Sequence, residues 1–119
     1  MKIAISCSGT SLDAPVDPRF GRAAKFIVLD TETSAFEIHD NVQNLNAAQG
    51  AGIQTAQTVS QLGAEAVITG HCGPKAFRTL QAAGVKVVVG AKGTVAEAVE
   101  AFKKGELKPA ESADVEGHW

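Results

Sequence analysis

AVITGHCGPKAFRTLQAAGVKVVV, residues 66–89, is the stretch of sequence that decides the fold. It begins with a short apolar run, residues 66–70, that ends in a glycine, which is typical of a buried strand. Residues 74–83 then have helical spacing, with proline in the first turn and glycine just past the end. A second apolar run, residues 85–89, follows. This strand–helix–strand unit predicts two parallel neighbouring strands joined by a right-handed crossover.

Three further strands are predicted before this unit. Residues 2–7 form an apolar run that stops at Ser8-Gly9, and residues 25–30 and 35–40 are further runs of strand type. The connection between the last two is short enough for an antiparallel hairpin. Because the first run is as apolar as the strands of residues 66–89, we expect it at the centre of the sheet. The predicted strand order is 3-2-1-4-5, with the second strand antiparallel.

Two more helices complete the prediction. From residue 47 to residue 62, small and apolar residues recur at helical spacing and a glycine follows. The last helix opens with Thr94 and Glu97, the pair that forms a capping box. The element order predicts an α/β domain, residues 1–107, with a five-stranded mixed sheet and three helices. Residues 108–119 are polar and are expected to form a flexible tail.

Length and charge limit the classes of function. The chain has 119 residues, of which 45% are hydrophobic and 20% are charged, as in a single globular domain. Its net charge of −2 argues against a nucleic-acid binder, which needs a basic face. The opening apolar run is too short for a signal peptide or a membrane span. We expect a cytoplasmic protein with reduced thiols and no membrane contact.

Unusual residues follow the three strands that are predicted to lie side by side. Cys7 closes the first strand, and His71 and Cys72 stand in the turn after the fourth. Ligands of open α/β sheets bind at these strand ends, where the connections diverge. Thiolate and imidazole are soft ligands that suit iron–sulfur, copper or zinc, so the three residues are candidate metal ligands. An inert buried thiol for Cys7, a capping role for His71 and a small filler role for Cys72 remain open alternatives.

The same turns carry features that suit an anion. Two of them open helices, whose free N–H groups and positive dipole ends favour negative charge. The segment of residues 8–22 is longer than most loops of compact domains, which indicates a functional loop, and it supplies two arginines. Lys75 and Lys92 stand near the other turns, and solvated surface charge is the alternative for all four cations. The candidate cofactor-binding residues are Ser8, Gly9, Arg19, Arg22, Gly73, Lys92, Gly93 and Thr94.

Several enzyme signatures are absent from the sequence. The turn of residues 90–94 is shorter than a P-loop, the glycines of residues 50–52 do not follow a strand, and no G-x-S-x-G motif occurs. An RNase H-like nuclease would need a metal-binding carboxylate on the first strand, and residues 2–7 hold none. A small enzyme with Cys72 as nucleophile, its pKa lowered by a helix N-terminus, remains an alternative.

Four motifs in order give the chain a resemblance to a known family. They are VDPRFGRA (residues 16–23), GAG (50–52), G-x-x-G-P-x-A (70–76) and G-T-V-x-E-A-V (93–99). Together they resemble the dinitrogenase iron–molybdenum cofactor biosynthesis family, which includes NifX- and NafY-like carriers and small stand-alone proteins. Members often have Asn-Pro before the first helix, whereas Asn44 is followed here by Leu45. The two positions held by His71 and Cys72 are commonly other residues, so their ligand role rests on their chemistry alone.

The resemblance implies an RNase H-like α/β fold and a non-enzymatic function. The cargo would be an iron–sulfur or iron–molybdenum cluster, with a molybdenum–copper cluster as a further candidate. The protein would carry or store this cluster, exchange it with cluster-assembly or recipient proteins, and exist as a monomer or weak homo-oligomer. A metal-free interaction or regulatory module is the remaining alternative.

Overall fold

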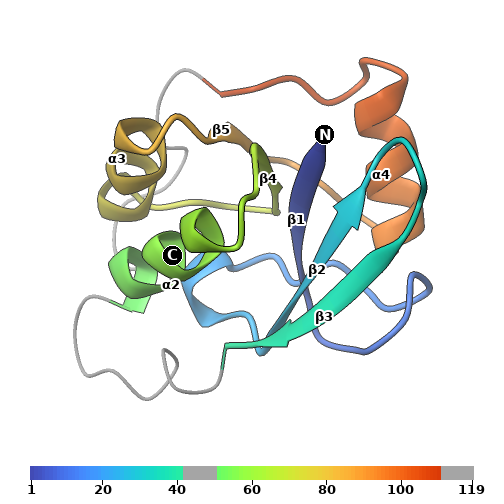
Figure 1. Cartoon of the computed structure of the whole chain (residues 1–119), viewed down its shortest axis with the longest axis horizontal. Helices are drawn as coiled ribbons and strands as arrows, with labels where there is room; N and C mark the ends of the chain where they lie inside the picture. Colours follow the sequence, from blue (N-terminus) through green and yellow to red (C-terminus); the bar gives the residue numbers. More distant parts are fainter. Residues whose placement is uncertain (42–50, 111–119) are drawn as a thin grey trace.

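The strands form one mixed sheet in the order β3-β2-β1-β4-β5 (Figure 1). The computed structural model describes residues 1–41 and 51–110. Strand β2 is antiparallel to both of its neighbours, whereas β1, β4 and β5 run parallel to one another. The predicted order and directions are therefore confirmed. The strands are β1 (Lys2–Cys7), β2 (Lys25–Asp30), β3 (Phe36–Asp40), β4 (Ala66–Ile68) and β5 (Lys86–Val88).

Helices cover both faces of this sheet. Helices α2 and α3 pack on one face and α4 packs on the other (Figure 1). The start of the first predicted helix, residues 47–50, lies outside the described residues. The short 3-10 helix η1 packs against α2. The bounds are η1 (Phe20–Arg22), α2 (Ala51–Gln61), α3 (Pro74–Ala82) and α4 (Val95–Lys103).

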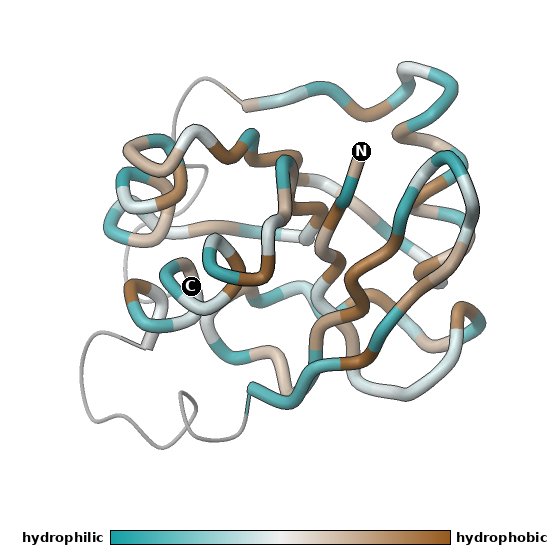
Figure 2. Tube along the Cα trace, in the orientation of Figure 1, coloured by the Kyte–Doolittle hydropathy of each residue, from teal (hydrophilic) through white to brown (hydrophobic). Residues whose placement is uncertain are grey.

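Alternation along the strands divides the apolar core into two clusters. In β1, Ile3 and Ile5 face α4, whereas Ala4 faces α2 and α3, because successive side chains of a strand point to opposite faces. Figure 2 shows hydrophobic residues along the central strands, while the helices alternate between hydrophobic and hydrophilic residues. Burial on both sides explains why β1, β4 and β5 are near-continuous apolar runs.

The loop of residues 8–22 closes the carboxyl ends of the parallel strands. Asp17 N–H donates to the Ser6 carbonyl at 2.9 Å, and the Ser6 hydroxyl donates to the Asp17 carbonyl at 2.7 Å. Ser6 Oγ also lies 2.8 Å from Thr69 Oγ1. Because the single proton of Ser6 is used on the carbonyl, Thr69 is the donor in this second bond. The loop is thus tied to β1 and, through Ser6, to the residue that follows β4.

Gly70 lets the loop approach the end of β4 closely. A Cβ atom at this position would lie 2.7 Å from Pro18 Cα and 2.9 Å from the Pro18 carbonyl oxygen, distances that a side chain does not tolerate. The close approach allows His71 N–H to donate to that carbonyl at 2.7 Å. Glycine is therefore required here for space between two backbone segments.

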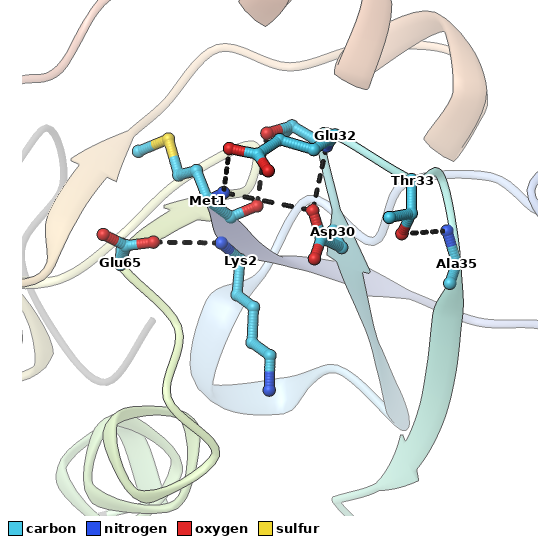
Figure 3. Close-up of polar contacts among 8 residues, drawn as sticks. Met1, Lys2, Asp30, Glu32, Thr33, Ala35 and Glu65 are labelled. Carbon is cyan, nitrogen blue, oxygen red and sulfur yellow. Dashed lines mark hydrogen bonds and ion pairs between the residues drawn. The ribbon is translucent and has the colours of Figure 1, made fainter.

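The opposite end of the sheet is closed by the first residues of the chain (Figure 3). The Met1 amino group lies 4.0 Å from Asp30 Oδ1 and 3.9 Å from Glu32 Oε1, and Lys2 N–H donates to Glu65 Oε2 at 3.1 Å. The Glu32 N–H that donates to Asp30 lowers the pKa of that carboxyl, and the charged amino group adds to the effect. These charges fasten the β2–β3 turn, far from the carboxyl ends of the parallel strands.

The chain after α4 returns to the sheet. Pro109 forms a bridge with Val88, and Ala110 N–H donates to the Val87 carbonyl at 2.7 Å. The first residues of the expected tail are therefore bonded to the outer edge of β5, and residues 111–119 lie outside the described residues. Within the described residues, no helix has the length and apolar character needed to cross a membrane.

The buried hydroxyl pair of Ser6 and Thr69 gives a test of how the loop is fastened. Ser6→Ala leaves the Asp17 carbonyl and the Thr69 hydroxyl without their shared partner, which should lower the free energy of unfolding by about 1–3 kcal/mol. Urea denaturation measures this loss, with Ser60→Ala on α2 as the control. In a cycle with Thr69→Val we expect a coupling of at least about 0.5 kcal/mol. Additive losses would contradict the shared bond.

Candidate functional site

Backbone hydrogen bonds join the turns that follow the three parallel strands. Gly90 N–H donates to the Gly70 carbonyl at 2.9 Å, and Ala91 N–H donates to the Thr69 carbonyl at 3.2 Å. Phe20 N–H donates to the His71 carbonyl at 3.2 Å, which adds the long loop to the same assembly. The turn after β4 (residues 69–73), the turn after β5 (residues 89–94) and the loop segment of residues 17–20 form one surface. It is called here the strand-end surface.

Arg19 and His71 are neighbours on the strand-end surface. Their backbones form a parallel bridge, Arg19 is exposed, and His71 is half-buried. Asp17 orients Arg19, because its Oδ1 accepts the Arg19 N–H at 2.9 Å and lies 3.9 Å from Arg19 Nε. Sequence reasoning missed this role of Asp17, although its spacing of two residues from Arg19 is typical of an Asx turn. The bridge makes neighbours of two backbone positions, far apart in the sequence, that carry a guanidinium and an imidazole.

The start of α3 adds an uncapped helix end beside this pair. Gly73 is the N-cap and has no side chain to accept a hydrogen bond, and Pro74 occupies the first turn. The backbone N–H groups of Lys75 and Ala76 therefore donate to no N-cap side chain, unlike those of a helix with a serine or threonine cap. His71 is two residues before the N-cap Gly73, so the imidazole and the positive end of α3 belong to one turn.

The start of α4 is closed, contrary to the expectation of an anion site there. Val95 N–H donates to the Ala14 carbonyl and Ala96 N–H to the Leu12 carbonyl, both at 2.9 Å. Thr94 Oγ1 accepts the Glu97 N–H at 3.1 Å, so the predicted capping box is confirmed. The loop and the cap together use the N–H groups of the first turn. The Thr94 hydroxyl and the N–H groups of Val95, Ala96 and Glu97 are therefore bonded to groups of the chain itself rather than open to an anion.

Glu97 adds negative charge at this helix start. Its Oε1 accepts the Thr94 N–H at 3.1 Å and would lie 2.7 Å from a Cβ atom at Gly93, whose φ of +80° also favours glycine. A carboxylate in this position stabilises the helix end and repels an anion. Lys92 is exposed beside it. Of the three candidates in this turn, Lys92, Gly93 and Thr94, only Lys92 carries a charge, and it is exposed.

The two thiols lie in separate parts of the core. Cys7 is 0% exposed and packs with Ile3 and Ile5 on the α4 face, whereas Cys72 is 0% exposed and packs in the cluster of α2 and α3. Sγ of Cys7 donates to the Gly9 carbonyl at 3.5 Å. Burial raises the pKa of the Cys7 thiol. The structure therefore does not bring Cys7, His71 and Cys72 together as one ligand set, and residues 1–41 and 51–110 hold no cluster of three or more metal-ligating side chains.

The remaining candidates surround the loop. Ser8 is exposed and Gly9 is approached by Ala14, since a Cβ atom at Gly9 would lie 2.7 Å from Ala14 Cβ. Arg22 is half-buried in η1, which packs against α2. Buried Cys72 offers no exposed sulfur for a nucleophilic reaction. The strand-end surface thus gathers exposed Arg19 and half-buried His71 next to buried Gly73, with exposed Lys92 in the turn after β5.

Comparisons with known proteins agree with this fold. A family model described as dinitrogenase iron–molybdenum cofactor matches residues 1–105. The apo form of the orange protein from Desulfovibrio gigas is 44% identical, with 96% of each chain covered and a TM-score of 0.94. A putative NifB protein from Thermotoga is 39% identical, with 98% of each chain covered and a TM-score of 0.84. An uncharacterized protein of Methanocaldococcus jannaschii is 27% identical over 110 residues, which are 91% of this chain and 90% of the relative.

Burial of the thiols predicts their reactivity. Because burial disfavours the thiolate, the pKa of Cys7 is raised and its thiolate fraction at pH 8 is below that of a free cysteine. Iodoacetamide should label Cys7 at least about ten-fold more slowly in the native protein than in guanidinium, with the native rate still rising at strongly alkaline pH. Peptide mass spectrometry assigns the label, and Cys72→Ala isolates Cys7. Native labelling as fast as that of the unfolded chain would contradict the buried position.

Proposed function

The chain belongs to the dinitrogenase iron–molybdenum cofactor family, and we propose that it binds an anionic metal cluster on the strand-end surface without catalysing a reaction. The family model spans residues 1–105, which include all the described strands and helices. The observation that carries the proposal is the placement of Arg19 and His71 beside the uncapped start of α3. A cation, an imidazole and a helix start without a side-chain cap favour an anion that also contains a metal.

The proposed binding mode depends on charge and hydrogen bonds more than on metal–protein bonds. Arg19 is exposed, and its Nε lies 3.9 Å from Asp17 Oδ1, which offsets part of its charge. Its guanidinium N–H groups can still donate to sulfide or oxide atoms of the cluster. His71 is half-buried and supplies one nitrogen ligand for iron or copper. Cys7 and Cys72 are ligands in this proposal only after the core around them opens, because both are fully buried. Lys92 adds positive charge at the rim.

An exposed site with few protein ligands suits a carrier or store. A cluster held at the surface can pass to another protein without unfolding of the domain, whereas a cage of buried ligands would retain it. The proposed partners are therefore the proteins that assemble the cluster and those that receive it. The cargo proposed is of the iron–sulfur or iron–molybdenum type, with molybdenum–copper as a further candidate.

Anaerobic loading tests the proposal. Apo-protein is incubated with iron(II) and sulfide, with these two and tetrathiomolybdate, or with copper(I) and tetrathiomolybdate, and bound metal and charge-transfer absorption are measured after gel filtration. Arg19→Ala should raise the dissociation constant about ten-fold, since one charged contact is worth roughly 1.4 kcal/mol. Added salt should weaken binding, because exposed charges are screened.

Lys86→Ala is the matched control. Lys86 is exposed and begins β5, at the end of the sheet opposite to the strand-end surface, so its removal changes net charge equally and should leave binding unchanged. Wild-type protein that retains no metal in any of the three mixtures would favour a metal-free module and contradict the proposal. Equal losses in Arg19→Ala and Lys86→Ala would show attraction by net charge rather than a site.

A further inference from the structure

Strand β3 leaves one edge of the sheet unpaired among the described residues. It is the last strand in the order β3-β2-β1-β4-β5. Asp30 N–H donates to the Ala35 carbonyl and Asn41 N–H donates to the Ala24 carbonyl, so odd-numbered residues of this strand bond to β2. Bonding alternates along an antiparallel pair, and the backbone N–H and C=O groups of Phe36, Ile38 and Asp40 therefore point outward.

The outer edge of β3 also carries an apolar surface. Phe36 is 39% exposed and Ile38 is 38% exposed, although both lie opposite buried residues of β2, Leu29 and Ile27. The apolar face of the core thus continues onto an exposed strand. Natural edge strands are often protected by charged side chains, proline or a bulge. Residues 36–40 contain no lysine or proline, and their charged residues are Glu37 and Asp40. Such an edge is suited to pairing with another strand.

We propose that the outer edge of β3 pairs antiparallel with the same edge of a second copy of this chain, about a two-fold axis at Ile38. The two five-stranded sheets would then continue into one another. A two-fold axis perpendicular to the sheet keeps each face on its own side, as an isologous interface requires. Ile38 then faces the second copy's Ile38, and six outward-pointing hydrogen-bonding groups on each copy, those of Phe36, Ile38 and Asp40, find partners.

Cross-strand side-chain pairing selects this register over its neighbours. With the axis at Ile38, Glu37 of each copy faces His39 of the other, at the non-hydrogen-bonded positions where side chains come closest. An axis at Glu37 would oppose two carboxylates, and an axis at His39 would oppose two imidazoles. Within one chain His39 Nε2 already lies 3.3 Å from Glu37 Oε2, so the two groups share one face of the strand. The sequence of β3 is self-complementary only about Ile38.

The opposite face of the strand is compatible with the same register. Phe36 would lie across from the second copy's Asp40, whose charge is met within its own chain by Lys25. The apolar contact is therefore made by Ile38 and Phe36 without an unpaired carboxylate at its border. The interface uses β3 at one side of the sheet and leaves the turns after β4 and β5 uncovered. The proposal does not depend on cluster binding.

Sedimentation equilibrium over a concentration series tests the dimer. Wild-type protein should associate reversibly with a dissociation constant below about 1 mM. Ile38→Lys places two ammonium groups at the axis and should raise that constant at least about ten-fold. Gln57→Lys, at an exposed position of α2, adds the same charge elsewhere and should leave it unchanged. Circular dichroism checks that each variant is folded. Wild-type protein that stays monomeric at about 1 mM would overturn the proposal.

A charge swap tests the register itself. His39→Glu opposes carboxylates across the axis and should weaken the dimer, whereas Glu37→His with His39→Glu restores the carboxylate–imidazole pairs and should recover it. Hydrogen exchange adds a backbone readout, because protection of the Phe36, Ile38 and Asp40 N–H groups should rise with protein concentration. A dimer that persists unchanged in Ile38→Lys, or protection that rises on another element, would place the interface elsewhere and contradict the assignment.

Discussion

The close contact between Gly70 and Pro18 is the constraint on which the strand-end surface depends. With 2.7 Å between Pro18 Cα and the position of a Cβ atom at Gly70, two backbone segments lie as near as a glycine allows. This approach lets His71 N–H reach the Pro18 carbonyl and sets Arg19 beside His71. The Ser6–Asp17 and Ser6–Thr69 hydrogen bonds fasten the same loop to β1 and to the residue after β4. The loop is thus a fixed part of the sheet's carboxyl edge.

This fixed loop decides where an anion can bind. Its carbonyl groups at Leu12 and Ala14 accept the N–H groups of the first turn of α4, so that helix end is closed. The start of α3 has a glycine N-cap, so no N-cap side chain accepts a hydrogen bond from its first N–H groups. The thiols lie beneath this surface on opposite faces of the sheet. The surface therefore offers cationic and polar groups outside and keeps sulfur inside, which suits reversible binding of a preformed cluster.

The sheet could be predicted because its strands are marked by apolar runs and its crossovers by helical periods between glycines. The face of Cys7 also follows from the alternation with Ile3 and Ile5 in β1. Cys72 stands in a turn, where no period applies, so its burial among α2 and α3 could not be read from the sequence. The Thr94–Glu97 capping box was visible and already indicated a carboxylate at the start of α4. The carbonyl groups that close that helix come from residues some eighty positions earlier in the chain, beyond the range of a local pattern.

The location of bound metal in a loaded crystal tests the central claim most directly. Anomalous X-ray scattering at the iron or molybdenum absorption edge identifies the metal independently of the protein atoms. We predict a metal peak on the strand-end surface, next to Arg19 and His71 and at the start of α3. A peak at the start of α4, or between the core clusters that hold Cys7 and Cys72, would contradict it.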